Sequence, residues 1–303
     1  HGARATFLFS LGPDSTGKAV KRIFRRGFVK KVLSASPAAS YGIRTMLYGT
    51  LLPAPDIGTR KEAVARMREV AAAGHECGVH AWDHVDWHDR LPQMDRGEVF
   101  GTFGRAADRF AEVFGRSAEV AGAPGWTANA RSVEAYEARG IRVASDTRGG
   151  RPFHPLRADG APSSIVEVPS TLPTLDELLA FDEFRGSKRE GSIDHLRRAV
   201  REAEGISVHS VHTEIEGGRA FAGLFARQLE AWTSDGVAFV TLTDVAYTLS
   251  LHDALPILFC QPPPRHDDDR RIGPRLSHAG RRRGCFYSEQ SARCSAELLG
   301  AVG

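Results

Sequence analysis

The sequence predicts an α/β protein whose parallel sheet closes as an irregular (β/α) barrel. Short apolar runs, typical of buried strands, alternate with amphipathic helical stretches through residues 1–246. Glycines end helical stretches, as at Gly74 and Gly140. The 303 residues, 42% hydrophobic and 25% charged, suffice for one large domain with a buried core. Because functional groups in such barrels collect where strands end, we expect the site residues there.

The apolar runs set the expected elements in chain order. Strands are predicted over residues 5–10, 77–79, 118–121, 141–144, 165–168, 206–211 and 237–240. One helix is predicted behind Thr59 as its N-cap, and others over residues 96–114, 129–139, 193–203 and 220–232. The helix at 96–114 carries the expected buried residues Val99, Phe103, Phe110 and Val113.

Residues 1–246 are predicted to form one domain, and residues 247–303 a non-native tail. Residues 247–257 resemble the in-frame translation of a widely used synthetic sequencing adapter. After them the hydrophobic periodicity is lost, and Arg and Pro become frequent. The chain begins with His rather than Met, so we expect it to be part of a longer protein.

The charge distribution argues against one class of function. The net charge of +3 resides in residues 258–303, which hold eight Arg and five Asp or Glu, so the rest of the chain is balanced. A globally basic nucleic-acid-binding protein is therefore not supported. The sequence has no apolar run of about 18 residues that would predict a transmembrane helix. Cys77 is the only cysteine before the tail, which favours a reducing compartment.

A basic segment with interleaved aromatic residues covers residues 18–31. It holds seven Lys or Arg and no acidic residue. Such a segment is typical of contact with anionic lipid headgroups, and a solvated insertion with an ordinary core-facing side is the alternative. The expected membrane-contact residues are Arg22, Phe24, Arg25, Arg26, Phe28, Lys30 and Lys31.

Two histidines four residues apart, His80 and His84, follow the strand predicted at 77–79. On one helical turn, or in a tight loop after a strand, this spacing directs two imidazoles to one point. Neutral imidazoles are common metal ligands. For the spacing alone, a histidine-rich polar turn would be the more frequent explanation. The preceding run Gly-His-Glu-Cys-Gly, residues 74–78, makes a metal site the better hypothesis.

A second candidate, His212, ends the strand predicted at 206–211. A strand-end histidine can act as a general acid because its ordinary pKa lies near neutrality. A surface histidine with no catalytic role is the alternative. His209, three residues earlier, would face the opposite side of a continuous strand. We favour His212 because the acidic, glycine-ended run Thr-Glu-Ile-Glu-Gly follows it.

Five stretches resemble the polysaccharide-deacetylase (NodB-like) superfamily and, within it, a family of formamido-sugar deformylases. These stretches are residues 7–14, 38–42, 79–84, 168–174 and 212–217. The resemblance covers residues 1–246 and implies a NodB-type (β/α) barrel with one catalytic domain. It implies removal of a formyl group from a polyprenyl-phosphate-linked amino sugar at the cytoplasmic face of the membrane. The family serves lipid A modification and resistance to polymyxin and other cationic peptides.

The resemblance also implies roles for individual residues. It places a divalent metal ion (Zn, Mn or Co) on His80 and His84 and makes His212 the catalytic acid. Residues 123–126, Ala-Pro-Gly-Trp, resemble the third motif of the superfamily, and residues 145–149, Ser-Asp-Thr-Arg-Gly, resemble the fourth. We therefore expect Asp146 in catalysis, with a turn-capping Asp as the alternative. Expected substrate-binding residues are Trp126, Arg148 and Glu214.

The chain departs from the pattern of the superfamily in two places. Gly122 stands where the third motif usually has Arg, a charge partner of the catalytic base, and Arg148 is a candidate replacement. The first motif, a strand with an Asp metal ligand and an Asp base, belongs before residues 6–9 and upstream of His1. We therefore expect a fragment that binds metal weakly and is nearly inactive, because zinc sites usually have at least three protein ligands.

Two other functions fit the same motifs. One is a polysaccharide or peptidoglycan N-deacetylase of the same superfamily, which would act on acetylated glycans. The other is a non-catalytic relative that binds a glycolipid and has lost its metal. Substrate specificity separates the first from a deformylase, and metal content separates the second.

Overall fold

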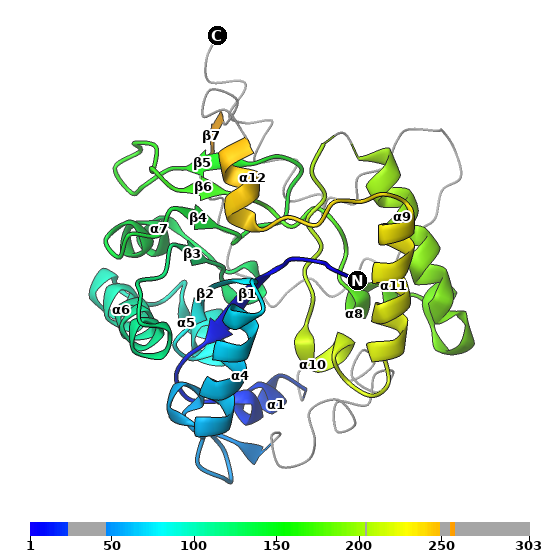
Figure 1. The fold of residues 1–303 in the computed structure, drawn as a ribbon. Helices are drawn as coiled ribbons and strands as arrows, with labels where there is room; N and C mark the ends of the chain where they lie inside the picture. The colour runs from blue at the N-terminus through cyan, green and yellow to red at the C-terminus, as the bar shows by residue number, and fades with distance from the viewer. Residues whose placement is uncertain (24–46, 204, 249–254, 258–303) are drawn as a thin grey trace, which may run out of the picture. The chain divides into compact units, whose positions relative to one another are not determined.

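The computed structural model describes residues 1–23, 47–203, 205–248 and 255–257. Within these residues one sheet has the strand order β1-β2-β3-β4-β6-β5-β7. The strands are β1 (Thr6–Ser10), β2 (Glu76–Ala81), β3 (Val120–Ala121), β4 (Val143–Ala144), β5 (Phe153–Pro155), β6 (Val166–Glu167) and β7 (Leu255–Ile257). From β1 to β6 through β2, β3 and β4 every pairing is parallel, and β5 runs antiparallel to β6. The carboxyl ends of five strands therefore lie along one edge of the sheet (Figure 1).

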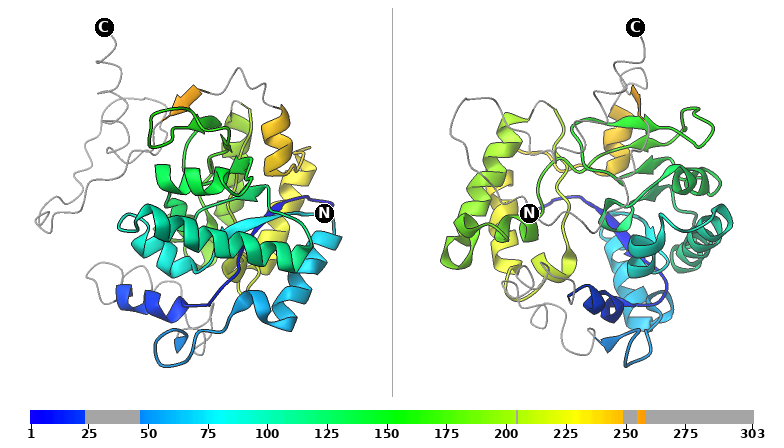
Figure 2. Two further views of the ribbon diagram at one scale, coloured as in Figure 1. Left: turned by 90° about the vertical axis from the view of Figure 1, so that its left-hand side faces the viewer. Right: turned by 180° about the vertical axis from the view of Figure 1, so that it is seen from behind.

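Helices connect the parallel strands. α4 (Lys61–Ala72) precedes β2, α6 (Arg96–Phe114) precedes β3, and α7 (Ala130–Glu137) precedes β4. In both figures α6 and α7 lie side by side on the outer side of these strands (Figures 1 and 2). The other α-helices are α1 (Thr16–Ile23), α5 (His84–Arg90), α8 (Leu175–Leu179), α9 (Gly191–Glu202), α10 (Thr213–Glu216), α11 (Ala222–Ser234) and α12 (Leu242–Thr248).

An aromatic cluster anchors the helix that begins at His84. Trp87 of α5 stacks on Tyr136 of α7 with ring centroids 6.4 Å apart, and Tyr136 lies 4.4 Å from Phe103 of α6. Each of the three residues is 1% exposed. Burial of one large apolar side chain stabilises a fold by roughly 1.5–3 kcal/mol. The cluster therefore fixes α5 firmly against the outer helices.

The helix predicted at 96–114 is confirmed as α6, and its four expected core residues are buried. The fold begins this helix with a capping box in which Asp95 accepts from the backbone of Glu98. The prediction that Thr59 is an N-cap is wrong. Thr59 ends a short 3₁₀ helix and its hydroxyl donates to the carbonyl of Asp56, so α4 starts at Lys61 behind Arg60.

The segments 206–211 and 237–240 were expected as strands but do not join the ladder. The first runs beside the residues that follow β6, where the carbonyl of Val208 accepts from Thr171 and Leu172. In return, the amide of Val208 donates to the hydroxyl of Thr171 rather than to a backbone carbonyl. Proline at 169 and 173 removes two further ladder donors from the partner segment. The extended conformation is retained without a regular ladder.

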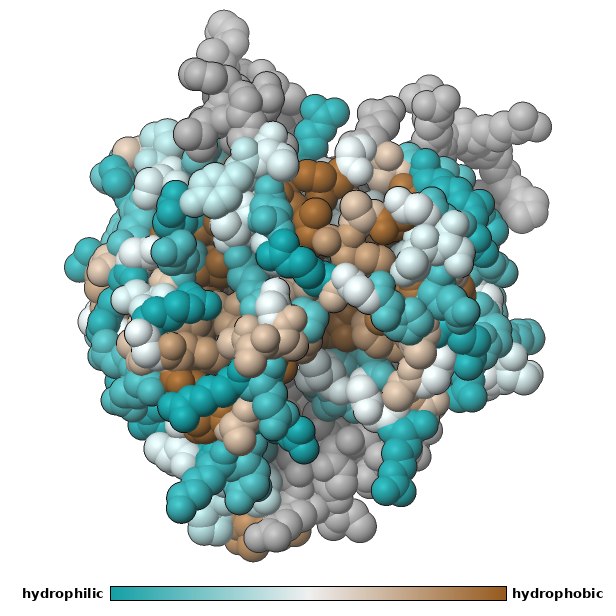
Figure 3. Space-filling model, viewed as in Figure 1, coloured by the Kyte–Doolittle hydropathy of each residue, from teal (hydrophilic) through white to brown (hydrophobic). Residues whose placement is uncertain are grey.

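The surface mixes polar and apolar residues. On the face seen in Figure 3, hydrophilic residues cover most of the periphery and hydrophobic residues gather toward the middle. Large hydrophobic residues with high exposure are Leu51, Phe181, Val240 and Tyr247. Within the described residues, no helix has the length and apolar character needed to cross a membrane. Of the expected membrane contacts, Arg22 belongs to α1 and the other six residues lie outside the described residues.

Candidate active site

His80 and His84 come together where β2 passes into α5. His80 is the last residue but one of β2, and His84 is the first residue of α5. Asp83, the N-cap between them, accepts from the amides of Val85 and Asp86 at 3.0 Å. The two imidazole centroids are 5.1 Å apart. The four-residue spacing thus brings the rings together across a strand–helix junction rather than on one helix.

The His80 ring has its tautomer set by the next strand. Its Nδ1 lies 2.6 Å from the carbonyl oxygen of Gly122, which follows β3, so Nδ1–H donates there. Burial, together with the neighbouring His84, lowers the pKa of His80 to about 3. The ring is therefore neutral at physiological pH, and its Nε2 lone pair remains available. A histidine that donates its other ring N–H to a carbonyl is the usual arrangement of a metal ligand.

His212 has the opposite electrostatic environment. It is the N-cap of α10, and its Nδ1 lies 2.9 Å from a carboxylate oxygen of Asp176. Asp176 lies in the first turn of α8, behind the capping box that Thr174 and Glu177 form. The hydrogen bond that His212 Nδ1–H donates to the Asp176 carboxylate outweighs burial and raises the pKa of His212 to about 9. His212 also contributes to lowering the pKa of His80, so the two imidazoles are within electrostatic range.

Sequence reasoning did not identify Asp176. Its separation from His212 is 36 residues, and no local pattern links the two. The one available signal was the Thr-x-x-Glu capping box over residues 174–177, which predicts a helix start and places Asp176 in its first turn. His209, the competitor of His212, is largely buried, which lowers its pKa to about 4.

Trp126 and Arg148 form a platform at the ends of β3 and β4. Trp126 has a left-handed backbone (φ 52°), which is rare for an aromatic residue and marks a constrained position. Its indole N–H donates to the hydroxyl of Ser170 at 3.0 Å, and Ser170 bonds Ser210 at 2.6 Å. The Arg148 guanidinium lies 4.6 Å from the centre of the indole ring and bonds Glu177 at 3.2 Å. The predicted substrate-binding pair therefore does lie together.

Asp146 occupies a buried position behind this platform. It is 0% exposed, and one carboxylate oxygen accepts from the amide of Ala123 at 2.6 Å. Its own amide donates to Glu167, which is also 0% exposed. Burial and the mutual repulsion of these carboxylates raise the pKa of Asp146, and burial raises that of Glu167 to about 7. Asp146 thus holds the loop that carries Trp126. Glu214, the remaining predicted substrate contact, is exposed on α10.

The side chains of His80 and His84 are of the kind that binds divalent metal ions. Two imidazoles, of which that of His80 is neutral with its tautomer fixed by a carbonyl, match the ligands that Zn and similar ions prefer. Over the part of the chain that the structure describes, no group of three His, Cys, Asp or Glu side chains is placed to hold an ion. The two imidazoles are therefore the protein ligands that these residues offer.

Comparisons with known proteins identify the fold and the family of the chain. The family model "Polysaccharide deacetylase" matches residues 55–144, which include His80 and His84. A crystal structure of a protein from Mycobacterium smegmatis, described as a polysaccharide deacetylase, superimposes with a TM-score of 0.53 at 20% identity, covering 87% of this chain and 96% of that one. This likeness confirms the predicted fold class.

Two curated relatives extend the match over most of the chain. One, from Shewanella sediminis (strain HAW-EB3), is 31% identical over 245 residues, covering 81% of this chain and 76% of the relative. The other, from Wigglesworthia glossinidia brevipalpis, is 26% identical over 243 residues, covering 80% of this chain and 82% of the relative. Both are named "Probable 4-deoxy-4-formamido-L-arabinose-phosphoundecaprenol deformylase ArnD". The chain therefore belongs to the 4-deoxy-4-formamido-L-arabinose-phosphoundecaprenol deformylase family of the polysaccharide deacetylases.

Proposed function

We propose that this chain hydrolyses the formamide of undecaprenyl-phosphate-linked 4-deoxy-4-formamido-L-arabinose. The products are formate and the 4-amino sugar, which serves lipid A modification and resistance to cationic peptides. The observation that carries the proposal is the proximity of a neutral His80 to a strongly basic His212 whose Nδ1 bonds Asp176. Because the pKa values of the two imidazoles differ, the neutral one suits a metal ligand and the charged one suits a general acid. The names of the two relatives support the choice of substrate.

His80 and His84 would hold the divalent ion (Zn, Mn or Co). The chemistry that such an ion supplies when bound is activation of water and polarisation of a carbonyl oxygen. His212 then has a distinct task. Its Nδ1 is engaged by Asp176, which leaves the proton on Nε2 for the departing nitrogen. Water adds its oxygen to the formyl carbon, the C–N bond breaks, and the nitrogen takes that proton. The proton that water gives up restores the charged ring of His212, so that formate and the amine are the products.

Trp126 and Arg148 are the proposed substrate platform. The indole offers an apolar face for a sugar ring, and the guanidinium is suited to the phosphate that links sugar and lipid. Arg148 would exchange its bond to Glu177 for one to the phosphate. Glu214 is placed on the exposed side of α10, where it can meet sugar hydroxyls. Asp146 contributes through the Ala123 backbone that it holds.

The decisive experiment measures formate release from the lipid-linked formamido sugar by a full-length clone, which restores the first motif expected upstream of His1, loaded with Zn, Mn or Co. An N-acetylated glycan tests the polysaccharide-deacetylase alternative in parallel. We expect formate from the first and no acetate from the second, with loss of activity in His80→Ala. Glu69→Gln, an exposed change on α4, is the matched control and should act like the parent. Preferential acetate release, or full activity of His80→Ala, would overturn the proposal.

We also propose peripheral attachment at the cytoplasmic face of the membrane through the basic residues 18–31. Each Lys or Arg near an anionic surface is worth about 1 kcal/mol of binding. The chain should therefore sediment with phosphatidylglycerol vesicles at low salt and dissociate as salt rises. Replacing Arg25, Arg26, Lys30 and Lys31 with Gln should abolish this binding. Equal binding to neutral phosphatidylcholine vesicles would argue against the electrostatic attachment.

A further inference from the structure

The half-buried indole of Trp126 has one polar atom, and a buried serine accepts its hydrogen bond. The indole Nε1–H donates to Ser170 Oγ at 3.0 Å, and Ser170 is 2% exposed. Because an indole nitrogen can only donate, the serine oxygen is the acceptor. Trp126 belongs to the loop after β3, whereas Ser170 lies 44 residues later, beyond β6. The indole is therefore held by a group outside its own loop.

Ser170 is itself fixed by backbone hydrogen bonds beside the other residue of the platform. Its amide donates to the carbonyl of Thr147 at 2.9 Å, and its carbonyl accepts from the amide of Gly149 at 3.3 Å. These two bonds form a parallel bridge between Ser170 and Arg148. The guanidinium of Arg148 lies over the face of the indole, and the hydroxyl of Ser170 meets its edge.

A second serine, Ser210, completes the hydrogen bonding of Ser170. The two hydroxyl oxygens are 2.6 Å apart. Within the part of the chain that the structure describes, Ser170 Oγ has hydrogen-bond contacts with the indole nitrogen and with Ser210 Oγ. The indole nitrogen accepts nothing, so the proton of Ser170 goes to Ser210, since a buried hydroxyl without an acceptor would be costly. The donors therefore run from Trp126 through Ser170 to Ser210.

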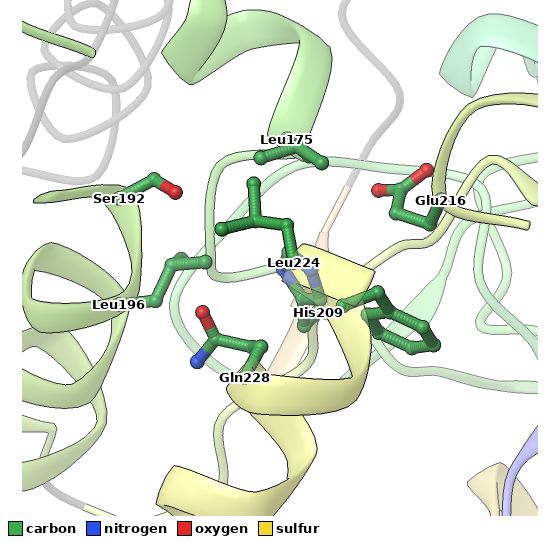
Figure 4. A pocket seen from close by; sticks show the side chains of 8 residues that line it. Leu175, Ser192, Leu196, His209, Glu216, Leu224 and Gln228 are labelled. Atoms are coloured by element: carbon green, nitrogen blue, oxygen red, sulfur yellow. The ribbon is translucent and has the colours of Figure 1, made fainter. Parts of the chain in front are cut away.

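Ser210 belongs to the extended segment that ends at His212. Adjacent side chains on such a segment point to opposite sides. His209 lines a small pocket together with residues of α9 and α11 (Figure 4). Ser210 points to the other side, where it meets Ser170. His212 follows two residues later and falls on the same side as Ser210, so the hydroxyl pair joins the platform to the side of the segment that carries the proposed acid.

The loop that carries Trp126 fixes the backbone of this residue but not its ring. Gly125 and Trp126 both have left-handed backbones, with φ of 57° and 52°. The indole of Trp87 on α5 donates to the carbonyl of Thr127 at 3.0 Å and anchors the loop from the opposite end. The two side-chain torsions of Trp126 are not set by these contacts. The hydrogen bond to Ser170 selects one orientation of the ring.

We propose that Ser170 is the positioning residue of Trp126 and that Ser210 holds the Ser170 hydroxyl in the orientation this task requires. Ser170 fixes the edge of the indole, and Arg148 covers its face. The ring then meets the sugar in one orientation, on the side of the site where His212 lies. The inference rests on the proposed function only for the role of Trp126 as a substrate platform.

The first test follows the indole N–H signals of the four tryptophans by NMR. Ser170→Ala removes the acceptor, so the Trp126 signal, assigned by its loss in Trp126→Phe, should shift and exchange with solvent about tenfold faster. The Trp87 signal should stay, because its acceptor is a backbone carbonyl of the same loop. Ser192→Ala, at an equally buried serine of α9, is the matched control and should leave all four signals in place. An unchanged Trp126 signal in Ser170→Ala would overturn the proposal.

The second test examines the link from Ser170 to Ser210. Ser210→Ala leaves the acceptor of the indole in place but removes the partner that orients it, so the Trp126 N–H should exchange about threefold faster than in the parent. The double variant Ser170→Ala/Ser210→Ala should exchange at the rate of Ser170→Ala, because Ser210 acts on the indole only through Ser170. A parent-like rate in Ser210→Ala, or effects that multiply in the double variant, would refute this link.

The third test measures steady-state kinetics of the full-length enzyme on the lipid-linked formamido sugar. Ser170→Ala should raise KM about fivefold and leave kcat within about twofold, since a misplaced platform weakens binding of the substrate and of the transition state alike. Ser192→Ala should keep both constants. A loss of kcat at unchanged KM would contradict the platform role of the ring. Failure of the parent to release formate would count against the proposed function, whereas the indole signals decide the positioning role without turnover.

Discussion

His80 and His212 are two histidines at the carboxyl ends of extended segments in one fold, yet their surroundings make them opposite in chemistry. A carbonyl oxygen and a second imidazole neighbour His80, and burial holds its pKa at about 3. A carboxylate neighbours His212 and raises its pKa to about 9. Residue type alone therefore does not assign the roles. The surroundings assign them, because burial keeps the His80 ring neutral despite its bond to a carbonyl, whereas the carboxylate at Nδ1 outweighs burial at His212 and stabilises the charged ring.

The largest expected effect is on metal affinity, in which the two histidine positions should differ. His84→Ala should weaken Zn binding by roughly 100-fold or more, since the loss of even a supporting partner typically costs 10–100-fold. His212→Ala should leave Zn affinity within about twofold, because a protonated imidazole is no ligand. Isothermal titration calorimetry of both variants measures the difference. Equal loss in the two variants would mean that His212 is a ligand and that the two histidines share one role.

The second prediction concerns the cause of the raised pKa of His212. Asp176→Asn removes the carboxylate that is the first cause of the raised pKa, while burial, which opposes it, remains. The pKa of His212 should fall from about 9 to 6.5 or below. NMR titration of the imidazole measures this change directly. Asp194→Asn, an exposed aspartate on α9, is the charge-matched control and should leave the pKa unchanged.

The same variant changes how stability depends on pH. Because the folded pKa of His212 exceeds the unfolded value of 6.5, its stabilisation is present below about pH 6.5 and lost as pH rises through 9. In Asp176→Asn this loss between pH 6.5 and 9 should disappear. Urea unfolding at pH 6 and pH 9 checks it. A pH dependence identical to that of the parent would show that Asp176 does not stabilise the imidazolium.

The sequence predicted the parts of this fold that depend on neighbouring residues. The helix over 96–114 was correct at both ends because the cap at Asp95 and the stop at Gly115 are local signals. The pairing of His80 with His84 was also foreseeable from a four-residue spacing. The contact between Asp176 and His212 was not, because it joins segments 36 residues apart whose packing no local pattern encodes. The buried pair of Asp146 and Glu167, 21 residues apart, escaped prediction for the same reason.

This buried pair gives the smallest effect and tests whether burial alone can move a pKa here. Glu167 has a folded pKa of about 7 against an ordinary 4.5, so stability should fall as pH rises from about 4.5 to 7 and level off above. Glu167→Gln keeps an oxygen for the amide of Asp146 and the hydroxyl of Thr147. Its amide nitrogen takes the place of the second oxygen of Glu167, a buried atom with no partner among the described residues, and removes the buried charge that forms at high pH.

We therefore expect Glu167→Gln to be more stable than the parent at pH 8 by about 1–2 kcal/mol, with a shallower decline between pH 4.5 and 7. Urea denaturation at pH 5 and pH 8 measures both quantities. Glu69→Gln breaks only an exposed ion pair with Arg66 and should change stability by less than about 0.5 kcal/mol at either pH. A loss of stability at pH 8 in Glu167→Gln would mean that the carboxylate is charged and needed. The buried pair behind Trp126 would then depend on a negative charge rather than on a neutral hydrogen-bonded contact.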